Sequence, residues 1–572
     1  MHRLIGLSAL VLMFMLNAVA AHAATVTGDW TGAIDAGLGR VFHLAIHIAA
    51  KPDGTFTGTL QDVDRGTGEL PVTAIAAGKD TLSFTVPLNP DATYTATWDA
   101  AAKQWVGQWK QSGQSLPLTL AAGLPTPKPK VEGLDGRWEG TITPGTTALH
   151  LVLHVKTGAL GTAAWLDSPD QTAYGLAVDT IKRDGANVSL ELPAVGAKFT
   201  GTLSTDGQTL AGQWGQGDKS FPISFAHLSS NAATPPPARP QTPKKPYPYR
   251  EEDVTFDDAA AHVRLAGTLT MPEGKGPFPA VVLVAGSGPN TRNEPIMGHQ
   301  LFLVIADHLT RAGIAVLRFD KRGTGASTGD FGKATTMDFA DDAAAAASYL
   351  RARPEIDPHR VGLIGHSEGG LIVPIVATHD PATAFIVMMA GPGVNGLDIM
   401  LEQGRLIAKA MGMTDAQLTQ LGAMREKMFA IVRSEKDPAA ATAKLKAILA
   451  EAAKAQHLPE NAFDQQIGAL NSDWFRFFFD YDPAATLAKV KCPVLALNGS
   501  LDLQVPPAQN LPAIRAALAK NPDAEVDELP NLNHLFQTAK TGSIGEYGQI
   551  EETIAPSAMD LMTRWILKRV GR

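Results

Sequence analysis

The stretch Val361–Gly370, VGLIGHSEGG, decides how the second half of this chain is read. An apolar run ends in Gly365-His366-Ser367-Glu368-Gly369, and a helix-compatible segment rich in Leu, Ile, Val and Ala follows. This pattern predicts a strand, a tight turn and a helix, with a serine at the apex of the turn. The flanking glycines allow the strand and the helix to pass close together without Cβ clashes. The stretch therefore predicts a strand–turn–helix unit that presents Ser367.

A serine in this position has what a nucleophile needs. A serine hydroxyl reacts poorly unless a base can reach it and backbone N–H groups can hold the oxyanion, which G-x-S-x-G between a strand and a helix allows. Asp502 lies just beyond an apolar strand in CPVLALNGSLDLQVP, and His534 lies in LPNLNHLF, after the last predicted strand. The order Ser367, Asp502, His534 predicts a triad of nucleophile, acid and general base.

Other residues compete for the roles of base and acid. His366 is held beside the serine by the backbone, so its ring cannot easily accept the serine proton, and we expect it to pack near the site. Asp480 and Asp482 are alternative acids, but they precede the strand that leads to Asp502. His534 is the only histidine after Asp502, which favours it as the base.

Two backbone N–H groups are expected to form an oxyanion hole. One belongs to Glu368, which directly follows the nucleophile. The other is expected in the Gly-rich turn VAGSGP (residues 284–289), where Ser287 is the first choice and Gly288 the second. Gly-rich turns also bind phosphates, but the chain has no G-x-x-x-x-G-K-[ST] motif.

From about residue 249 onward, predicted strands and helices alternate, which indicates a mostly parallel sheet with helices on both faces. Between residues 395 and 482 the alternation gives way to a largely helical insert. Thr414 and Gln417 form a predicted capping box there, and an apolar stripe recurs at helical spacing: Leu418, Leu421, Met424, Met428 and Ile431. We expect this insert to be a cap over the strand ends, with an adaptable apolar pocket beneath it.

The N-terminal part is β-like and repeats itself, with one copy in residues 24–125 and a second in 126–228. GDWTG at Gly28 recurs as GRWEG at Gly136, and GQW at Gly107 recurs as GQW at Gly212. A period of roughly a hundred residues indicates a duplicated small domain, since solenoid repeats are much shorter. Alternation of period two predicts an antiparallel barrel or sandwich in each copy.

Aromatic and histidine residues of these repeats have two readings. A set of tryptophans could form a binding platform for a sugar or lipid, but we expect them to fill small cores: Trp30, Trp105, Trp109, Trp138, Trp165 and Trp214. Pairs of histidines four apart, at 43 and 47 and at 150 and 154, resemble metal ligands. Residues four apart on a strand lie about 13 Å from each other, too far to share one ion, so a solvated face is expected.

Residues 229–248 are proline-rich and predict a stiff linker. Residues 1–23 predict a signal peptide, with a basic start, a short apolar core and cleavage near Ala23 in Ala21-His22-Ala23. The only cysteine is Cys492, which excludes an intrachain disulfide. We therefore expect an exported chain, periplasmic or secreted, with no transmembrane segment in its mature form.

Six segments resemble one superfamily and occur in its order: AGSGPNTRNE, LRFDKRGTGAS, GHSEGG, DWFRFFFDYDP, LNGSLDLQVPP and LNHLFQTAKTG. Together they are similar to the α/β-hydrolase superfamily, in particular its exported bacterial esterase and serine-aminopeptidase-like branch. The resemblance covers residues 249–572 and leaves out the β repeats. It implies hydrolysis through an acyl-enzyme, with no cofactor and no metal. It also implies that Asp320, Arg322 and Gly323 are scaffold, whereas Ala285 departs from the histidine of many relatives.

The leading prediction is an exported carboxylesterase-like serine hydrolase acting on a small-molecule ester. A peptidase acting on an aminoacyl or prolyl bond of a short peptide is the alternative. It would need acidic cap residues for a free amino group, and the candidates are Glu402, Glu426, Glu435 and Glu451. A second alternative is surface or glycan binding by the β repeats. A net charge of −8 gives no basis for nucleic-acid binding.

Overall fold

A computed structural model describes residues 26–571, except 36–40, 66–68, 89–91, 112–113, 144–148, 170–172, 218, 229–236, 411 and 456–462. The predicted signal peptide and its cleavage site lie outside the described residues, as do residues 229–236 of the predicted linker. The chain divides into two compact units. One unit contains residues up to 233 together with 452–465, and the other contains 234–451 with 466–572.

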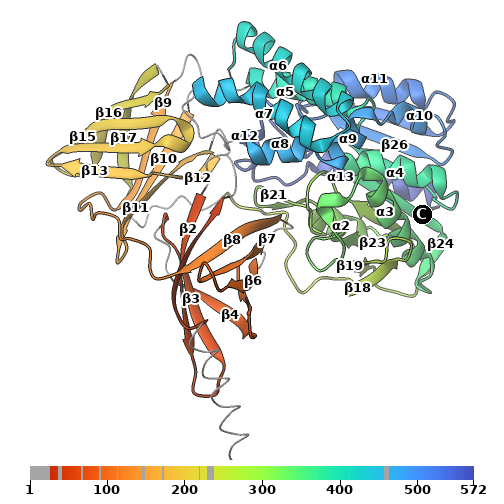
Figure 1. The fold of residues 1–572 in the computed structure, drawn as a ribbon. Coiled ribbons are helices and arrows are strands. Elements are labelled where there is room, and N and C mark those ends of the chain that lie inside the picture. The colour runs from red at the N-terminus through yellow and green to blue at the C-terminus, as the bar shows by residue number, and fades with distance from the viewer. Residues whose placement is uncertain are drawn as a thin grey trace, which may run out of the picture. The chain divides into compact units, whose positions relative to one another are not determined.

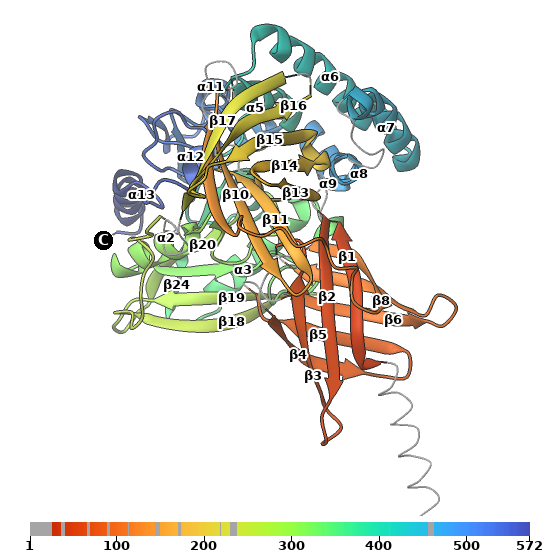
Figure 2. The ribbon, with the colours of Figure 1, turned by 90° about the vertical axis from the view of Figure 1, so that its left-hand side faces the viewer.

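The first β repeat is a closed antiparallel barrel (Figure 2). Its first strand pairs with its last through Trp30 and Ala122, so the sheet closes on itself. Side chains of alternating residues fill the interior, among them Trp105, Tyr94 and Phe84. The strands are β1 (Gly28–Asp35), β2 (Val41–Ala50), β3 (Phe56–Asp62), β4 (Leu70–Ala77), β5 (Thr81–Val86), β6 (Ala92–Asp99), β7 (Gln104–Gln111) and β8 (Gln114–Ala122).

The second repeat forms a nine-stranded sheet in the order β12-β11-β10-β9-β17-β16-β15-β14-β13. In the barrel, the first half of β4 pairs with β3 and its second half with β5, across a register shift between Thr73 and Ala76. In the second copy two short strands take the place of β4: β12 pairs with β11, and β13 pairs with β14. The strands are β9 (Gly136–Ile142), β10 (Leu149–Gly158), β11 (Gly161–Ser168), β12 (Ala173–Ala177), β13 (Thr180–Asp184), β14 (Asn187–Leu192), β15 (Ala197–Leu203), β16 (Thr209–Gln216) and β17 (Lys219–Leu228).

Equivalent side chains of the two copies make equivalent contacts. The indole N–H of Trp30 donates to the carbonyl of Val26, and that of Trp138 donates to the carbonyl of Leu134, both at 2.8 Å. Five of the six tryptophans singled out in the sequence are buried, as expected for core residues. The sixth, Trp165, stacks on the ring of His154.

His43 and His154 each contact one carboxylate. His43 Nδ1 lies 2.8 Å from Asp64 Oδ2, and His154 Nε2 lies 2.9 Å from Asp167 Oδ2. Across the residues that the structure describes, no group of three or more His, Cys, Asp or Glu side chains could hold a metal ion.

The second unit is built on an eight-stranded sheet in the order β18-β19-β23-β20-β24-β25-β26-β27. The strands from β23 to β27 run parallel, whereas β18 and β19 pair antiparallel at one edge. The strands are β18 (Arg250–Asp258), β19 (Val263–Met271), β20 (Phe278–Val284), β23 (Ala315–Phe319), β24 (Ile356–His366), β25 (Ile386–Met389), β26 (Val494–Gly499) and β27 (Ala524–Leu529), beside a small ribbon of β21 (Pro295–Ile296) and β22 (His299–Gln300).

Helices cover both faces of this sheet (Figure 1). Alternate residues of β20 enter separate cores: Val282 packs with one set of helices and Val281 with the other. The first core takes α3 (Thr336–Arg351), α4 (Glu368–His379), α10 (Pro483–Leu487) and α11 (Pro507–Ala517), and the second takes α2 (Leu301–Arg311) and α13 (Pro556–Arg569). The short helix α12 (Ile544–Tyr547) precedes α13. Within the described ranges, no helix is long and apolar enough to span a membrane.

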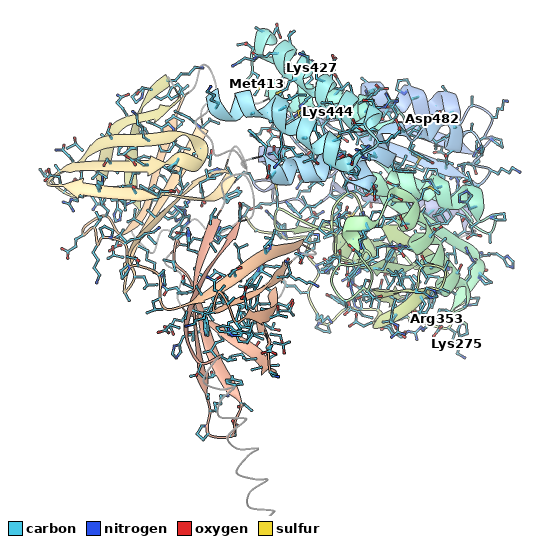
Figure 3. All side chains as sticks on the ribbon, in the orientation of Figure 1. Lys275, Arg353, Met413, Lys427, Lys444 and Asp482 are labelled. Carbon is cyan, nitrogen blue, oxygen red and sulfur yellow. The ribbon has the colours of Figure 1, made fainter. Side chains whose placement is uncertain are left out.

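A helical insert between β25 and β26 forms the predicted cap. Its helices are α5 (Gly396–Ala410), α6 (Asp415–Ser434), α7 (Pro438–Ala455), α8 (Asp464–Leu470) and α9 (Asp473–Asp480). Thr414 and Gln417 make the predicted capping box of α6. Figure 3 labels Lys427 on α6 and Lys444 on α7, which mark these two cap helices.

The described part of the proline-rich segment, residues 237–248, contains no helix or strand and lies against the second unit. The guanidinium of Arg239 donates to the carbonyls of Gly548 at 2.7 Å and Ile550 at 3.1 Å. Gln241 Nε2 donates to the carbonyl of Ile554 at 2.7 Å. This part of the segment, which proline content predicts as a stiff linker, is therefore anchored on the second unit.

Candidate active site

Ser367 stands at a sharp turn between β24 and α4. Its backbone has φ 55° and ψ −116°, a conformation that a non-glycine residue rarely adopts. Its N–H donates to the carbonyl of Met389 on β25 at 2.8 Å. A Cβ at Gly369 would overlap the carbonyl of Val284, and a Cβ at Gly365 would overlap that of Gly369. The glycines therefore let α4 pack against the sheet and fix the apex on which Ser367 sits.

Asp502 and His534 meet at the carboxyl ends of neighbouring strands. Asp502 follows β26, and His534 follows β27. His534 Nδ1 lies 2.8 Å from Asp502 Oδ2, and both side chains are almost fully buried. The other oxygen, Asp502 Oδ1, accepts the backbone N–H groups of Gln504 at 2.7 Å and Val505 at 2.9 Å. This arrangement fixes the carboxylate of Asp502. It occupies Nδ1 of His534, so Nε2 is the ring nitrogen that does not contact Asp502.

Ser367 and His534 border the same cavity, whose volume is about 790 Å³. Ser287, Gly288 and Glu368 border it too, so the structure brings the predicted oxyanion residues to the predicted nucleophile. The first N–H groups of a helix have no acceptor within the helix, which leaves that of Glu368 free of intrahelical bonds at the start of α4.

The alternative acids lie elsewhere. Asp480 pairs with Arg433 at 2.8 Å on the exposed side of the cap. Asp482, labelled in Figure 3, caps α10 by accepting the N–H of Ala484 at 3.0 Å. Neither borders the cavity, whereas Asp502 holds His534 directly.

Most of the cavity wall is apolar. Its aliphatic and aromatic side chains come from the cap and from the loops below it: Ile296, Met297, Phe331, Pro392, Ile399, Met400, Trp474, Phe475, Phe478, Val505, Leu535, Ile544 and Tyr547. Met400 is the one cap methionine in this wall among the described residues. The cap therefore supplies an apolar pocket, mainly through aromatic side chains of α9.

Glu368 has a role in its side chain as well as its backbone. Its carboxylate accepts from Lys321 Nζ at 2.9 Å, Thr336 Oγ1 at 2.8 Å and Trp474 Nε1 at 2.6 Å. Lys321 also donates to the carbonyl of Gly286, in the predicted oxyanion loop, at 2.7 Å. The sequence analysis did not identify Lys321, although it named its neighbours Asp320, Arg322 and Gly323 as scaffold.

Those neighbours act as scaffold, as expected. Asp320 accepts from Arg292 at 2.8 Å, and Arg322 binds Asp342 at 2.8 Å. Burial raises the pKa of Asp342 to about 6, although the bond to Arg322 opposes the shift.

Sequence reasoning also missed Glu294. Its Oε1 lies 3.0 Å from His366 Nδ1 and accepts the N–H of Gly286 at 2.7 Å. His366 Nε2 lies 3.1 Å from the backbone carbonyl of His534. Burial disfavours charge on the His366 ring, but the charge of Glu294 and the bond to it outweigh burial and raise its pKa. The sequence signal for Glu294 was its place in TRNE, at the end of the segment AGSGPNTRNE that resembles the superfamily.

Parts of the chain are similar to known proteins. Residues 258–525 match the model of the X-Pro dipeptidyl-peptidase (S15) family. The chain is 26% identical to esterase EstD of Thermotoga maritima over 323 residues, which cover 56% of this chain and 69% of that protein.

Among solved structures, an esterase of Pyrococcus furiosus matches with a TM-score of 0.36 and 17% identity over 58% of this chain and 98% of that one. An α/β hydrolase of Penicillium sp. sh18 has a TM-score of 0.36 and 16% identity over 56% of this chain and 100% of that one. The sheet order and the turn at Ser367 are those of an α/β-hydrolase fold, and in sequence the chain is similar to esterases and peptidases.

Proposed function

We propose that the protein is an exported serine hydrolase that cleaves carboxylic esters. One observation carries the proposal: a serine at a strained turn and a histidine bonded to a buried aspartate share one apolar cavity. Export rests on the sequence of residues 1–23.

The chemistry follows from the placement of the groups. His534 Nε2 removes the proton of Ser367 Oγ as that oxygen attacks the acyl carbonyl carbon. Asp502 holds the imidazolium that forms, while the N–H groups of Glu368 and Ser287 bind the oxyanion, with Gly288 as the alternative donor. The alcohol leaves with the proton from His534. A water molecule, activated by the same histidine, then adds to the acyl-enzyme and releases the acid.

The carboxylates around the cavity favour an ester over a peptide with a free amino terminus. An aminopeptidase needs an acidic group to bind the ammonium of its substrate. Glu294 and Glu368 border the cavity, but Glu294 Oε1 and both oxygens of Glu368 already accept hydrogen bonds from protein groups, and Glu294 Oε2, which has no partner, is buried. Glu402 pairs with Arg405, and Glu435 pairs with Lys444. Among the described side chains, Glu402, Glu426 and Glu435 do not border this cavity, and the side chain of Glu451 lies outside the described residues.

A serine peptidase is the second candidate, and the S15 match over residues 258–525 favours it. That family is described as X-Pro dipeptidyl-peptidases. The same acyl-enzyme chemistry would serve, because only the leaving group differs.

The test compares the mature protein with Ser367→Ala on p-nitrophenyl esters of increasing acyl length and on aminoacyl and prolyl nitroanilides. We expect ester turnover that falls at least about a thousandfold in the variant. Ser434→Ala, on the exposed surface of α6, is the matched control and should keep full activity. Turnover confined to nitroanilides would move the assignment to a peptidase. Undiminished ester turnover by Ser367→Ala would refute the nucleophile.

A further inference from the structure

Three parts of the candidate site converge on one buried carboxylate. Glu294 is 1% exposed and lies in the loop after β20. Its Oε1 accepts the N–H of Gly286, the residue before Ser287, and lies 3.0 Å from the ring of His366, the residue before Ser367. The ring of His366 reaches on to the carbonyl of His534. Glu294 thus connects the oxyanion loop, the nucleophile turn and the loop of the base.

The contacts of His366 define the charge on its ring. Both ring nitrogens face acceptors, a carboxylate oxygen at Nδ1 and a backbone carbonyl at Nε2. A neutral imidazole carries one N–H, so it can satisfy only one of these acceptors, whereas an imidazolium satisfies both. Glu294 Oε1 accepts the N–H of Gly286 and also faces the His366 ring. The geometry is therefore that of an ion pair.

The backbone supports this interpretation. Glu294 has φ 46°, in the left-handed region that residues with a Cβ rarely adopt. Strain of this kind persists where surrounding contacts hold the residue in place, and such residues gather at functional sites. A Cβ at Gly286 would lie 3.1 Å from both Glu294 Oε1 and Ser367 Cβ, which shows how closely the three groups pack.

We propose that Glu294 and His366 are positioning residues that hold the oxyanion loop, Ser367 and His534 in reactive register as a buried carboxylate–imidazolium pair. The pair acts on the reaction through Gly286 and the His534 backbone and does not touch the reacting atoms. The inference rests on the proposed serine-hydrolase function and names residues that this function needs.

The pair gives the reaction a pH dependence of its own. The charged groups that face His366 are Glu294 and Asp502, with the His534 ring 4.9 Å away, centre to centre. The Lys321–Glu368 pair lies beyond the Gly286 carbonyl. Because the pKa of His366 is raised in the folded protein, its charge is fully present below the ordinary histidine value. The charge, and the order that it supports, are lost as pH rises through the raised value.

Glu294→Gln tests the pair because the amide keeps the shape and an acceptor oxygen but removes the charge. We measure kcat and KM from pH 5 to 10 on a p-nitrophenyl ester, and count reactive serines with a fluorophosphonate. We expect kcat per reactive serine to fall roughly ten- to hundredfold, because small misplacements of reacting groups cost that much. KM should change less than about threefold, and the alkaline limb of kcat should move to lower pH.

Glu402→Gln, at an exposed ion pair of α5, is the matched control. A Glu294→Gln variant whose kcat per reactive serine and pH profile match this control would overturn the inference. If Glu294→Gln fails to fold, His366→Gln replaces the ring charge with a neutral amide donor. The same fall in kcat is expected from it, and full kcat would overturn the inference. Ser367→Ala, run in parallel, separates the two claims, because its continued activity would refute the proposed function itself.

Discussion

Ser367 owes its position to residues that carry no reactive group. Its strained backbone persists because β24, β25 and α4 meet around it without intervening side chains. Gly369 touches the end of β20, and Gly370 touches Gly391 after β25. The glycines near Ser367 therefore matter because they have no side chain.

Gly369→Ala should therefore damage the site. The new Cβ would overlap the carbonyl of Val284 and push α4 away from β20. We expect a loss of about 1–3 kcal/mol in the free energy of unfolding, as for other overpacked cores, together with loss of ester turnover. Calorimetric unfolding of the full chain measures the first and p-nitrophenyl ester hydrolysis the second.

Gly422→Ala on α6 is the control for this prediction, and we expect it to raise stability instead of lowering it. A Cβ there meets nothing within 4 Å, and alanine suits a helix better than glycine. The variant should gain about 0.5–1 kcal/mol and keep its activity. Equal effects of the two substitutions would contradict the packing argument.

The candidate triad residues could be placed from the sequence because each follows a predicted strand, and a parallel sheet gathers the loops at the carboxyl ends of its strands. Glu294 could not be found in this way. Its partners Gly286 and His366 come from different loops, and only the folded sheet brings them together. Lys321 was missed for a similar reason, since a lysine in sequence looks solvated, while here it is 3% exposed between Glu368 and Gly286.

At the scale of elements, α9 connects the cap to the nucleophile turn. Trp474 on this helix donates to Glu368. Arg476, two residues on, donates to the carbonyls of Val432 and Glu435 at the end of α6, each at 2.7 Å. Helix α9 therefore connects the largest cap helix to the first residue of α4.

Trp474→Phe keeps an aromatic ring but removes its bond to Glu368. Hydrogen bonds to charged groups contribute about 1.5–3 kcal/mol, so the unfolding free energy should fall by a similar amount. We also expect KM for esters to rise, because the aromatic wall of the cavity loses its anchor. Thermal unfolding and steady-state kinetics measure the two effects.

Arg433→Ala provides the comparison, since it removes a half-exposed ion pair between α6 and α9. Its effect should stay within about 0.5 kcal/mol. A Trp474→Phe variant as mild as Arg433→Ala would show that the bond to Glu368 does not anchor the cap.

The cap also shows where helical periodicity misleads. The stripe of Leu418, Leu421, Met424, Met428 and Ile431 recurs at the right spacing, yet these residues are only half-buried. The buried residues of α6 are Phe429 and Val432, and the ring of Phe429 packs 4.9 Å from that of Phe479 on α9. Periodicity predicts that a helix has an apolar face, but the neighbouring helix decides which residues become buried.

At the scale of the whole molecule, residues that look like a linker belong to the α/β unit. Proline content describes the local chain, whereas the contacts of Arg239 and Gln241 depend on carbonyls about 310 positions later in the chain. No local pattern could have revealed them.

A chain that begins at residue 237 should therefore be more stable than one that begins at residue 249. The shorter chain loses the bonds of Arg239 and Gln241, and at about 1 kcal/mol for each bond we expect a deficit of at least about 2 kcal/mol. Urea unfolding of the two truncated chains measures it. The full chain with Arg239→Ala and Gln241→Ala should show the same loss in the α/β unit, and equal stability of both truncations would refute the anchoring.

The division of one strand into β12 and β13 has a further consequence. These strands stand at the two ends of their sheet order, and end strands are the places where neighbouring molecules join by backbone pairing and aggregate. Each is only 5 residues long; β13 carries Lys182, Arg183 and Asp184, and β12 contains Gly175. Short length and charge are what discourage such joining. Val178 and Asp179, between the two strands, still donate to Ala164 of β11 and Glu191 of β14, so this segment joins the two ends of the sheet order and leaves only short strand edges for length and charge to protect.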